Sequence, residues 1–309
     1  MDWPAADLTG IDLNHADLQN ADLSDMDLTA ADLSNADLAG ASLSSANLPY
    51  ADLSDANMTS ADLTFANLSH ADLTGTDLSY ADLRLARMGD AKLRDAKMCD
   101  AQVDFVHLVA ADLSSAGLSG ASLISARLMA ASLIAADLGH AVLREVDLRG
   151  ADLSHANLRD ADLRGADLSY ADLSGADLLR VRLPPLDMLI AVRWSTETQW
   201  GRRTDEIRER SIARGAGRYV LNPSCSPARA IAAPLMHCGT AKFAPWHRLA
   251  RSTDLLGELT TFQYAMPSIC TRWSRRSAVH GVIASIRSRR SSSSAKISRA
   301  RQRAAMPRS

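Results

Sequence analysis

Several features that mark common protein classes are missing from this sequence of 309 residues. No apolar run approaches the ~20 residues that a transmembrane helix needs, so we expect no membrane span. The four cysteines show no framework spacing, which argues against a disulfide scaffold and favours a reducing compartment. The opening residues, Met1-Asp2-Trp3-Pro4, lack the basic and apolar segments of a secretory signal. We therefore expect a cytoplasmic protein.

Motifs for catalysis and for cofactor or metal binding are also missing. No Gly-rich phosphate loop and no G-x-S-x-G nucleophile elbow occurs. Cys225 and His237-Cys238 lie 12 or more residues apart and lack a second C-x-x-C or H-x-x-x-H pair, which argues against zinc. We predict no catalytic residue, no cofactor and no metal site, and hence a protein that is not an enzyme.

The sequence contains instead 36 consecutive five-residue units from Ala6 to Leu183, without an insertion or deletion. Every fifth position from Leu8 onward is apolar, with 32 Leu, three Met and one Val. Ala stands two residues earlier in 30 of the 36 units, usually with Asp or Asn between. The unit therefore reads A-[D/N]-L-x-x. A fixed period repeated this often indicates a solenoid.

A period of five fits neither an α-helix nor a plain strand, because it matches neither the 3.6-residue nor the two-residue repeat. Ala and Leu, two apart, point inward as in a strand, and the Asp between them points outward. The two x residues must then turn the chain, and Ser, Thr, Asn, Asp and Gly recur there. The histidines His15, His70, His140 and His155 fall on these outward turn positions, where a solvated imidazole is the simpler interpretation.

These A-[D/N]-L-x-x units resemble the pentapeptide repeat family over about three-fifths of the chain. The resemblance implies an all-β fold, a right-handed quadrilateral β-helix with four of these units in each coil. The 36 units would make about nine coils, and a rod ~43 Å long if neighbouring strands lie ~4.8 Å apart. We assign residues 1–188 to this β-helix.

The ends of an open stack of strands need covering. Trp3 falls in register with the Leu positions and is expected to lid the first coil, with Pro4 blunting the edge. Pro184-Pro185 interrupts the repeat at the other end. Residues 189–221 are expected to form a C-terminal cap with a short helix, which Thr204 would N-cap and Arg214-Gly215 would end. Dimerisation through this cap is an alternative role.

Residues 222–309 differ sharply from the repeat, with 15 Lys and Arg against two acidic residues and with Ser-rich runs. We predict disorder for this basic tail. An out-of-frame end is an alternative. Few aromatic residues interleave with the charge, so nucleic-acid binding by the tail is not expected.

The repeat region is strongly acidic. Residues 1–183 hold 29 acidic and 12 basic residues, a net charge of −17. That is one charge per ~2.5 Å of rod, against ~1.7 Å for duplex DNA. Hydrogen bonding of Asp to the turn backbone is the structural alternative. The candidate acidic binding surface lies in the C-terminal half: Asp152, Asp162, Asp167, Asp172 and Asp177.

A basic stretch interrupts the acidic repeat in the middle of the rod, where it either neutralises nearby acid or forms a partner-binding patch. With four units in each coil, Arg87, His107 and Arg127 would stack in one column. Phe105 would point outward on the same face as Phe65, two coils away. The candidate mid-rod patch comprises Arg84, Arg87, Lys92, Arg94, Lys97 and Phe105.

A smooth rod filled by Leu and Ala has no cleft for chemistry, so we predict a non-enzymatic protein-interaction module. The resemblance includes a subset of the family that imitates DNA and protects type II topoisomerases from quinolones. The specific hypothesis is a DNA mimic that binds DNA gyrase or another DNA-binding enzyme through its C-terminal half. The alternative is a structural scaffold or docking rod with an unknown protein partner.

Overall fold

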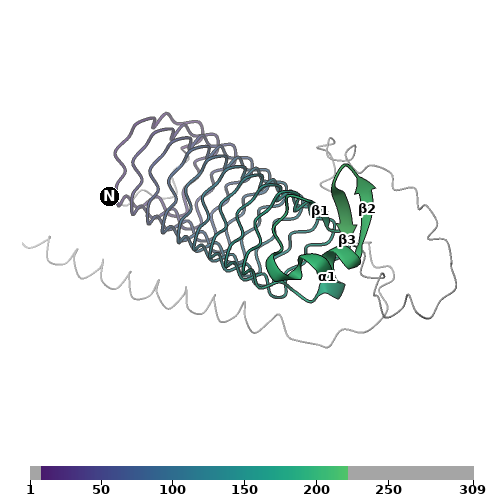
Figure 1. Ribbon diagram of the computed structural model, residues 1–309. Coiled ribbons are helices and arrows are strands. Elements are labelled where there is room, and N and C mark those ends of the chain that lie inside the picture. The colour runs from purple at the N-terminus through teal and green to yellow at the C-terminus, as the bar shows by residue number, and fades with distance from the viewer. Residues whose placement is uncertain (1–7, 222–309) are drawn as a thin grey trace, which may run out of the picture. The chain divides into compact units, whose positions relative to one another are not determined.

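The computed structural model describes residues 8–221 (Figure 1). The expected lid at Trp3 and Pro4 and the expected disorder of residues 222–309 fall outside these described residues and stay predictions. In the described part, no helix is long and apolar enough to cross a membrane.

Parallel β-bridges stack the repeat into regular coils. They join the central outward residue of each unit to its equivalent four units later, from Asp12 with Asp32 to Asp162 with Arg182. Four units therefore make one coil, and each coil has four sides (Figure 1). The predicted all-β solenoid is confirmed. The count of nine coils stays a prediction, because the first units lie partly outside the described residues.

The interior of the coils is built from the Ala and Leu positions of the motif. From Leu28 to Leu178 the Leu-position side chains are at most 1% exposed, and the Ala-position residues are equally buried. Leu ladders run along the stack because equivalent residues lie directly above one another. Burial of a Leu side chain stabilises a fold by roughly 1.5–3 kcal/mol, so this core dominates the stability of the rod.

Most units with a central Asp or Asn satisfy their five backbone N–H groups in the same way, as the unit around Leu33 shows. Asp32 and Leu33 donate to the coils below and above, to Ile11 O and Asp52 O. Asn35 also donates to the coil above, and the next Ala closes the turn by donating to Leu33 O. The remaining group, Ser34 N–H, donates to Asp32 Oδ1 at 3.0 Å. The Asp of the motif thus has a structural role as an acceptor for the turn.

The fifth residue of each unit has a left-handed backbone. The seven Gly at this position have φ between 63° and 76°, as the turn chemistry predicts. Most fifth positions are nevertheless not Gly, for example His15 at 57° and Tyr170 at 65°. A left-handed residue costs roughly 1–2 kcal/mol. The core and the inter-coil hydrogen bonds on both sides of each turn must offset this cost.

The coil pattern continues past Pro184-Pro185 with a longer spacing. Asp172 bridges to Arg193 and Asp177 bridges to Gln199, one and two positions beyond the regular four-unit step. A short 3-10 helix, η1 (Leu186–Met188), takes up part of the extra length. The cap is therefore seated on the last coil by continuing its hydrogen-bond ladder.

The cap that follows contains a small sheet that the sequence did not predict. Its elements are β1 (Arg193–Ser195), η2 (Gly201–Arg203), α1 (Thr204–Glu209), β2 (Ser211–Gly215) and β3 (Arg218–Leu221). The strands are antiparallel in the order β1-β3-β2, at the C-terminal end of the stack (Figure 1). Trp194 is buried between Trp200 and Tyr219, with ring centroids 6.1 and 4.3 Å away.

The predicted ends of the cap helix are wrong. Thr204 is the first residue of α1 and Arg203 is the N-cap. The Thr204 hydroxyl donates to Gly201 O at 2.9 Å, because η2 immediately precedes the helix and supplies that carbonyl. The helix ends at Glu209, and Arg214-Gly215 belongs to β2. The cap sheet pairs Gly215 with Arg218 of β3, and Arg214 lies in the irregularity just before this pair, so the sheet overrides their local preference for a helix end.

Candidate protein-interaction surfaces

The net negative charge of the rod is concentrated in its N-terminal half. We define the N-terminal half as residues 8–83 and the C-terminal half as residues 84–183. The N-terminal half holds 13 Asp and no Lys or Arg, whereas the C-terminal half holds 14 acidic and 12 basic residues. With ~4.8 Å per coil, the N-terminal half is about 18 Å long and carries one charge per ~1.4 Å. The C-terminal half carries one net charge per ~12 Å.

Two neighbouring sides of the coil collect most of the carboxylates in the N-terminal half. On one side, consecutive bridges join Asp12, Asp32, Asp52 and Asp72. The next side carries a second column, which includes a bridge between Asp17 and Asp37. We call the residues of these two columns the acidic face: Asp12, Asp32, Asp52, Asp72, Asp17, Asp37 and Asp77.

Hydrogen bonds from the turns fix the direction of these carboxylates, for example at Asp12, Asp32 and Asp52. The Ser34 hydroxyl and backbone N–H both donate to Asp32 Oδ1 and lower the pKa of Asp32 below its ordinary value. Thr29 lowers the pKa of Asp27 in the same way. Because the donors are part of the turn, the carboxylates are held on the rigid backbone of the rod.

Four residues of the predicted mid-rod patch pair with nearby carboxylates. Arg84 contacts Asp82, with its Nε 2.7 Å from Asp82 Oδ1. The other three reach across one coil: Lys92 to Asp72 at 2.9 Å, Lys97 to Asp77 at 3.8 Å and Arg94 to Asp112 at 3.1 Å. These four residues therefore neutralise nearby carboxylates, which is one of the two roles that the sequence left open. The pairs at Asp72, Asp77 and Asp82 mark the end of the cation-free half.

Arg87 and Phe105, the other two members of the patch, are placed differently. The predicted column of Arg87, His107 and Arg127 is confirmed by consecutive bridges. Burial, together with the adjacent guanidinium groups of Arg127 and Arg87, lowers the pKa of His107. Phe105 lies at the turn beside this column, as does Phe65 two coils before it. Within residues 8–221, Arg87 forms no ion pair, so it is the patch residue that stays open to a partner.

The structure does not bring the candidate acidic residues of the C-terminal half onto one surface. Asp152 and Asp172 bridge on one side, but Asp162, Asp167 and Asp177 lie on the other three sides. Four of the five also have a cation nearby: Arg164 with Asp162 at 2.6 Å, Arg149 with Asp167 at 3.8 Å, Arg193 with Asp172 at 3.1 Å and Arg159 with Asp177 at 2.6 Å. Asp152 alone forms no ion pair within the described residues.

Asp162 is the most enclosed of these carboxylates, with 7% of the residue exposed. Arg164 donates to both of its oxygens, and Arg144 donates to Oδ2 at 2.8 Å. Arg182 lies 3.8 Å away. The hydrogen bonds from Arg164, followed by those from Arg144, hold the pKa of Asp162 far below its ordinary value.

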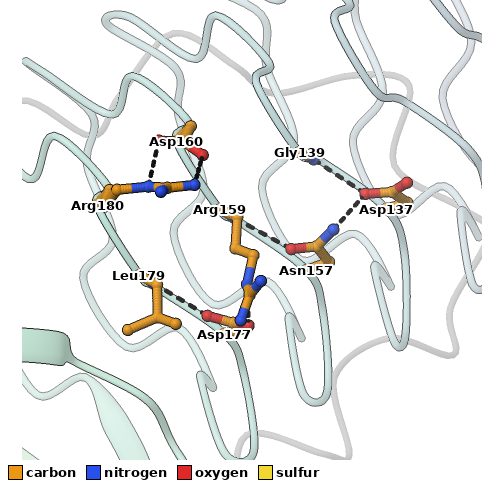
Figure 2. A network of polar contacts seen from close by, with 8 residues as sticks. All are labelled: Asp137, Gly139, Asn157, Arg159, Asp160, Asp177, Leu179 and Arg180. Atoms are coloured by element: carbon orange, nitrogen blue, oxygen red, sulfur yellow. Dashed lines mark hydrogen bonds and ion pairs between the residues drawn. The ribbon is translucent and has the colours of Figure 1, made fainter.

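Figure 2 shows how the C-terminal half pairs its charges on another part of the rod. Arg180 donates from two nitrogens to the two oxygens of Asp160, at 2.8 and 2.7 Å. Arg159 donates to Asp177 at 2.6 Å, one coil away. Asn157 donates to Asp137 at 2.7 Å. The side-chain partner of the Asp137 carboxylate is thus a neutral amide and not an arginine. The carboxylates of Asp137, Asp160 and Asp177 therefore already have hydrogen-bond partners within the protein.

The acidic face was missed from the sequence because net charge was summed over the whole repeat. The signal that would have found it is the position of the first basic residue. No Lys or Arg occurs before Arg84, and twelve occur from Arg84 to the end of the repeat. The two halves have the same motif and differ only in what occupies its outward positions.

The predicted turn histidines lie at exposed, left-handed positions. One of them, His70, stacks on Tyr50 with ring centroids 4.9 Å apart. Cys99 is the free cysteine of the described residues and is partly buried. No group of three His, Cys, Asp or Glu side chains in residues 8–221 is arranged to hold a metal ion.

Comparison with known proteins supports the architecture. A family model described as pentapeptide repeats matches five stretches: 6–44, 36–75, 66–102, 111–150 and 141–180. HetL, a pentapeptide repeat protein involved in heterocyst differentiation regulation from the cyanobacterium Nostoc sp. strain PCC 7120, is 31% identical. The match covers 55% of this chain and 90% of HetL, with a TM-score of 0.35.

A second similar structure is trypsin-treated QnrB1, described as a plasmid-mediated fluoroquinolone resistance protein. It is 22% identical over 58% of this chain and 90% of that chain, with a TM-score of 0.33. A pentapeptide repeat protein from the thylakoid lumen of Arabidopsis thaliana is 27% identical over 35% of this chain and 65% of its own, with a TM-score of 0.18. No curated protein matches the chain.

Proposed function

The chain belongs to the pentapeptide repeat family, whose members are right-handed quadrilateral β-helices, and we propose that it is a non-enzymatic protein-interaction module. In this proposal the acidic face of the N-terminal half binds the DNA-binding surface of a partner enzyme. DNA gyrase or another type II topoisomerase is the specific partner proposed. Protection of that enzyme from quinolone-type inhibitors is the consequence proposed for such binding.

The observation that carries the proposal is the excess of carboxylates in the N-terminal half, which has no Lys or Arg of its own. Cations of the C-terminal half reach Asp72, Asp77 and Asp82, at the far end of the N-terminal half. Its 13 carboxylates over about 18 Å give one charge per ~1.4 Å, close to the ~1.7 Å of duplex DNA. An enzyme surface that binds DNA displays Lys and Arg at a complementary density. A rod with this density can therefore occupy the same surface.

The rigidity of the acidic face also supports the proposal. Turn hydrogen bonds and inter-coil bridges hold the carboxylates of Asp12, Asp32 and Asp52 in place before any partner binds. Binding therefore orders few side chains on this protein, which lowers the entropic cost of association. The C-terminal half supports this role less well, since half of its 14 carboxylates already pair with cations and its net charge is only −2. We accordingly locate the binding surface in the N-terminal half rather than at Asp152–Asp177.

The experiment compares two matched variants of the full chain in a gyrase supercoiling assay. The first replaces Asp12, Asp32, Asp52 and Asp72 with Asn, and the second replaces Asp152 and Asp172 on the same side with Asn. Asn keeps the acceptor that the turn N–H needs, as Asn57 does for Thr59 at 3.2 Å. The first variant should inhibit supercoiling at least about tenfold less well, since each exposed ion pair contributes ~0.2–1 kcal/mol.

The second variant should inhibit supercoiling as the unchanged chain does. Excess linear DNA should relieve the inhibition by the unchanged chain, because both bind the same surface. Equal inhibition by all three proteins, or no inhibition at micromolar protein, would contradict the proposal.

A structural scaffold or docking rod is the second candidate function. The observation that favours it is the column of Arg87, His107 and Arg127, where two arginines lie exposed beside Phe105. Such a column suits an acidic segment of another protein. In a pull-down with the full chain, Arg87→Gln with Arg127→Gln would abolish capture under this function and leave gyrase inhibition unchanged.

A further inference from the structure

A cleft lies between the cap sheet and the last coils of the rod. It has a volume of about 500 Å³ and is partly open to solvent. The rod contributes His155, Asp172 and Ser174, and the cap contributes residues of all three strands. Here the smooth surface of the rod gives way to a hollow large enough for a small molecule.

Each strand of the cap sheet supplies one arginine to this cleft: Arg193 from β1, Arg214 from β2 and Arg218 from β3. The pairing explains how two of them meet. Arg193 is opposite Val220 and Ser195 is opposite Arg218, so residues two apart on each strand project from the same face. Because Asp172 bridges to Arg193, this face continues the outer side of the rod that carries Asp172.

The three arginines differ in whether a carboxylate balances their positive charge. Arg193 Nε lies 3.1 Å from Asp172 Oδ2, and Ser174 N–H donates to Oδ1 of the same carboxylate. Arg214 and Arg218 form no ion pair with any residue from 8 to 221. The cleft therefore has two guanidinium groups whose charge no described carboxylate contacts.

A hydroxyl donor completes the set of groups. Ser195 Oγ accepts from Gly175 N–H at 3.1 Å and from Glu197 N–H at 3.3 Å. With two donors already directed at its oxygen, the hydroxyl hydrogen of Ser195 must point elsewhere. His155 lies against Gly175, where an added Cβ would come within 2.5 Å of its Nδ1. The absence of a side chain at Gly175 thus gives the imidazole its place beside the cleft.

We propose that this cleft binds a phosphate-bearing small molecule, held by Arg214 and Arg218. Guanidinium groups present paired N–H donors that match the oxygens of a phosphate, and the Ser195 hydroxyl supplies a further donor. The volume lies within the ~300–1,000 Å³ of small-molecule sites and exceeds what one phosphate ion fills. The acidic face cannot hold such a ligand, so this site is separate from the proposed partner-binding surface.

Glu197 allows a test of whether the cleft prefers an anion or a cation. Its exposed carboxylate lines the same cleft and should oppose an anion there. Glu197→Gln removes this charge without removing any arginine, so it should tighten phosphate binding. A cleft that selects a cation, or no ligand, would show weaker binding or no change.

The experiment is isothermal titration of the full chain with pyrophosphate, with succinate as a dicarboxylate of similar length. The chain should bind pyrophosphate at least tenfold more tightly than succinate. Arg214→Gln with Arg218→Gln should weaken pyrophosphate binding at least tenfold, and Glu197→Gln should strengthen it two- to fivefold. The matched control is Arg202→Gln, an exposed arginine of η2 outside the cleft, which should bind as the unchanged chain does.

Unchanged melting temperatures would show that each variant is folded. The proposal is overturned if pyrophosphate does not bind, if succinate binds equally well, or if Arg202→Gln and the double variant weaken binding equally. An unfolded double variant leaves the sign of the Glu197→Gln effect as the deciding result, with weaker or unchanged binding overturning the proposal.

Discussion

The two halves of the rod share one motif and one backbone but treat charge in opposite ways. In the N-terminal half, carboxylates stack in columns with no Lys or Arg among them. In the C-terminal half, arginines at the first turn position, such as Arg84, Arg94 and Arg164, reach a carboxylate of their own unit or of the next coil. The fold accommodates both arrangements.

This difference separates the structural role of the motif Asp from its charge. The Asp supplies an acceptor for the turn N–H, and Asn57 and Asn67 supply one as well, as Asp32 does. Stacked carboxylates ~4.8 Å apart repel by roughly 0.9 kcal/mol in water. The excess of carboxylates over cations in the N-terminal half is therefore a feature that the fold tolerates and does not require, which is consistent with a role in binding.

The largest expected effect concerns what the two halves have in common, the Leu core. Leu33 and Leu133 are 0% and 1% exposed, at equivalent places five coils apart. Leu→Ala at either should lower the free energy of unfolding by about 2–5 kcal/mol, from lost burial and the cavity that remains. Thermal denaturation followed by circular dichroism would measure both. A loss in one half only would show that the coils are not equally packed.

Replacing one Asp in each half should have smaller effects of different sign. Asp162→Asn leaves Arg144 and Arg164 without their carboxylate and should cost about 1 kcal/mol, since these arginines are half exposed and water screens them. Asp52→Asn keeps the acceptor for Ser54 N–H and relieves repulsion from its neighbours. It should leave stability unchanged or slightly raised. Chemical denaturation of both variants would compare them, and equal losses would contradict the contrast between the halves.

The pH dependence of the same variant tests whether the cost in the C-terminal half is ionic. The pKa of Asp162 lies below its ordinary value of 3.8 in the folded protein, because Arg164 and Arg144 hydrogen-bond to the carboxylate. Its contribution to stability should be complete above pH 3.8 and decline as the pH falls toward the depressed pKa. The difference in melting temperature between Asp162→Asn and the unchanged chain should therefore shrink in acid. A difference that persists unchanged at low pH would show that the cost is not ionic.

The sequence predicted which residues point inward and outward because equivalent positions of all the units have the same environment. The four units in each coil were implied by the resemblance to the pentapeptide repeat family. The column of Arg87, His107 and Arg127 and the pairing of Asp152 with Asp172 follow from that number and are confirmed by the bridges. Which carboxylate an arginine pairs with could not be predicted. Arg84 selects its own unit and Arg94 selects the next coil, a choice made by flexible side chains and not by the period.

The cap could not be predicted for a related reason. β2 and β3 are five and four residues long, and they contain Gly and Arg rather than an alternating apolar pattern. They become strands because the coil ladder positions β1, which then pairs with β3. The cleft and its three arginines depend on this tertiary pairing.

The acidic face of the N-terminal half, in our proposal, takes the place of DNA on a DNA-binding enzyme. The decisive measurement is displacement of a fluorescently labelled DNA duplex from gyrase by the full chain, followed by anisotropy. We expect full displacement that weakens steeply as salt rises, and at least a tenfold loss of potency when Asp12, Asp32, Asp52 and Asp72 become Asn. Binding of the chain to gyrase without release of the duplex, or equal potency of the Asn variant, would contradict this role for the acidic face.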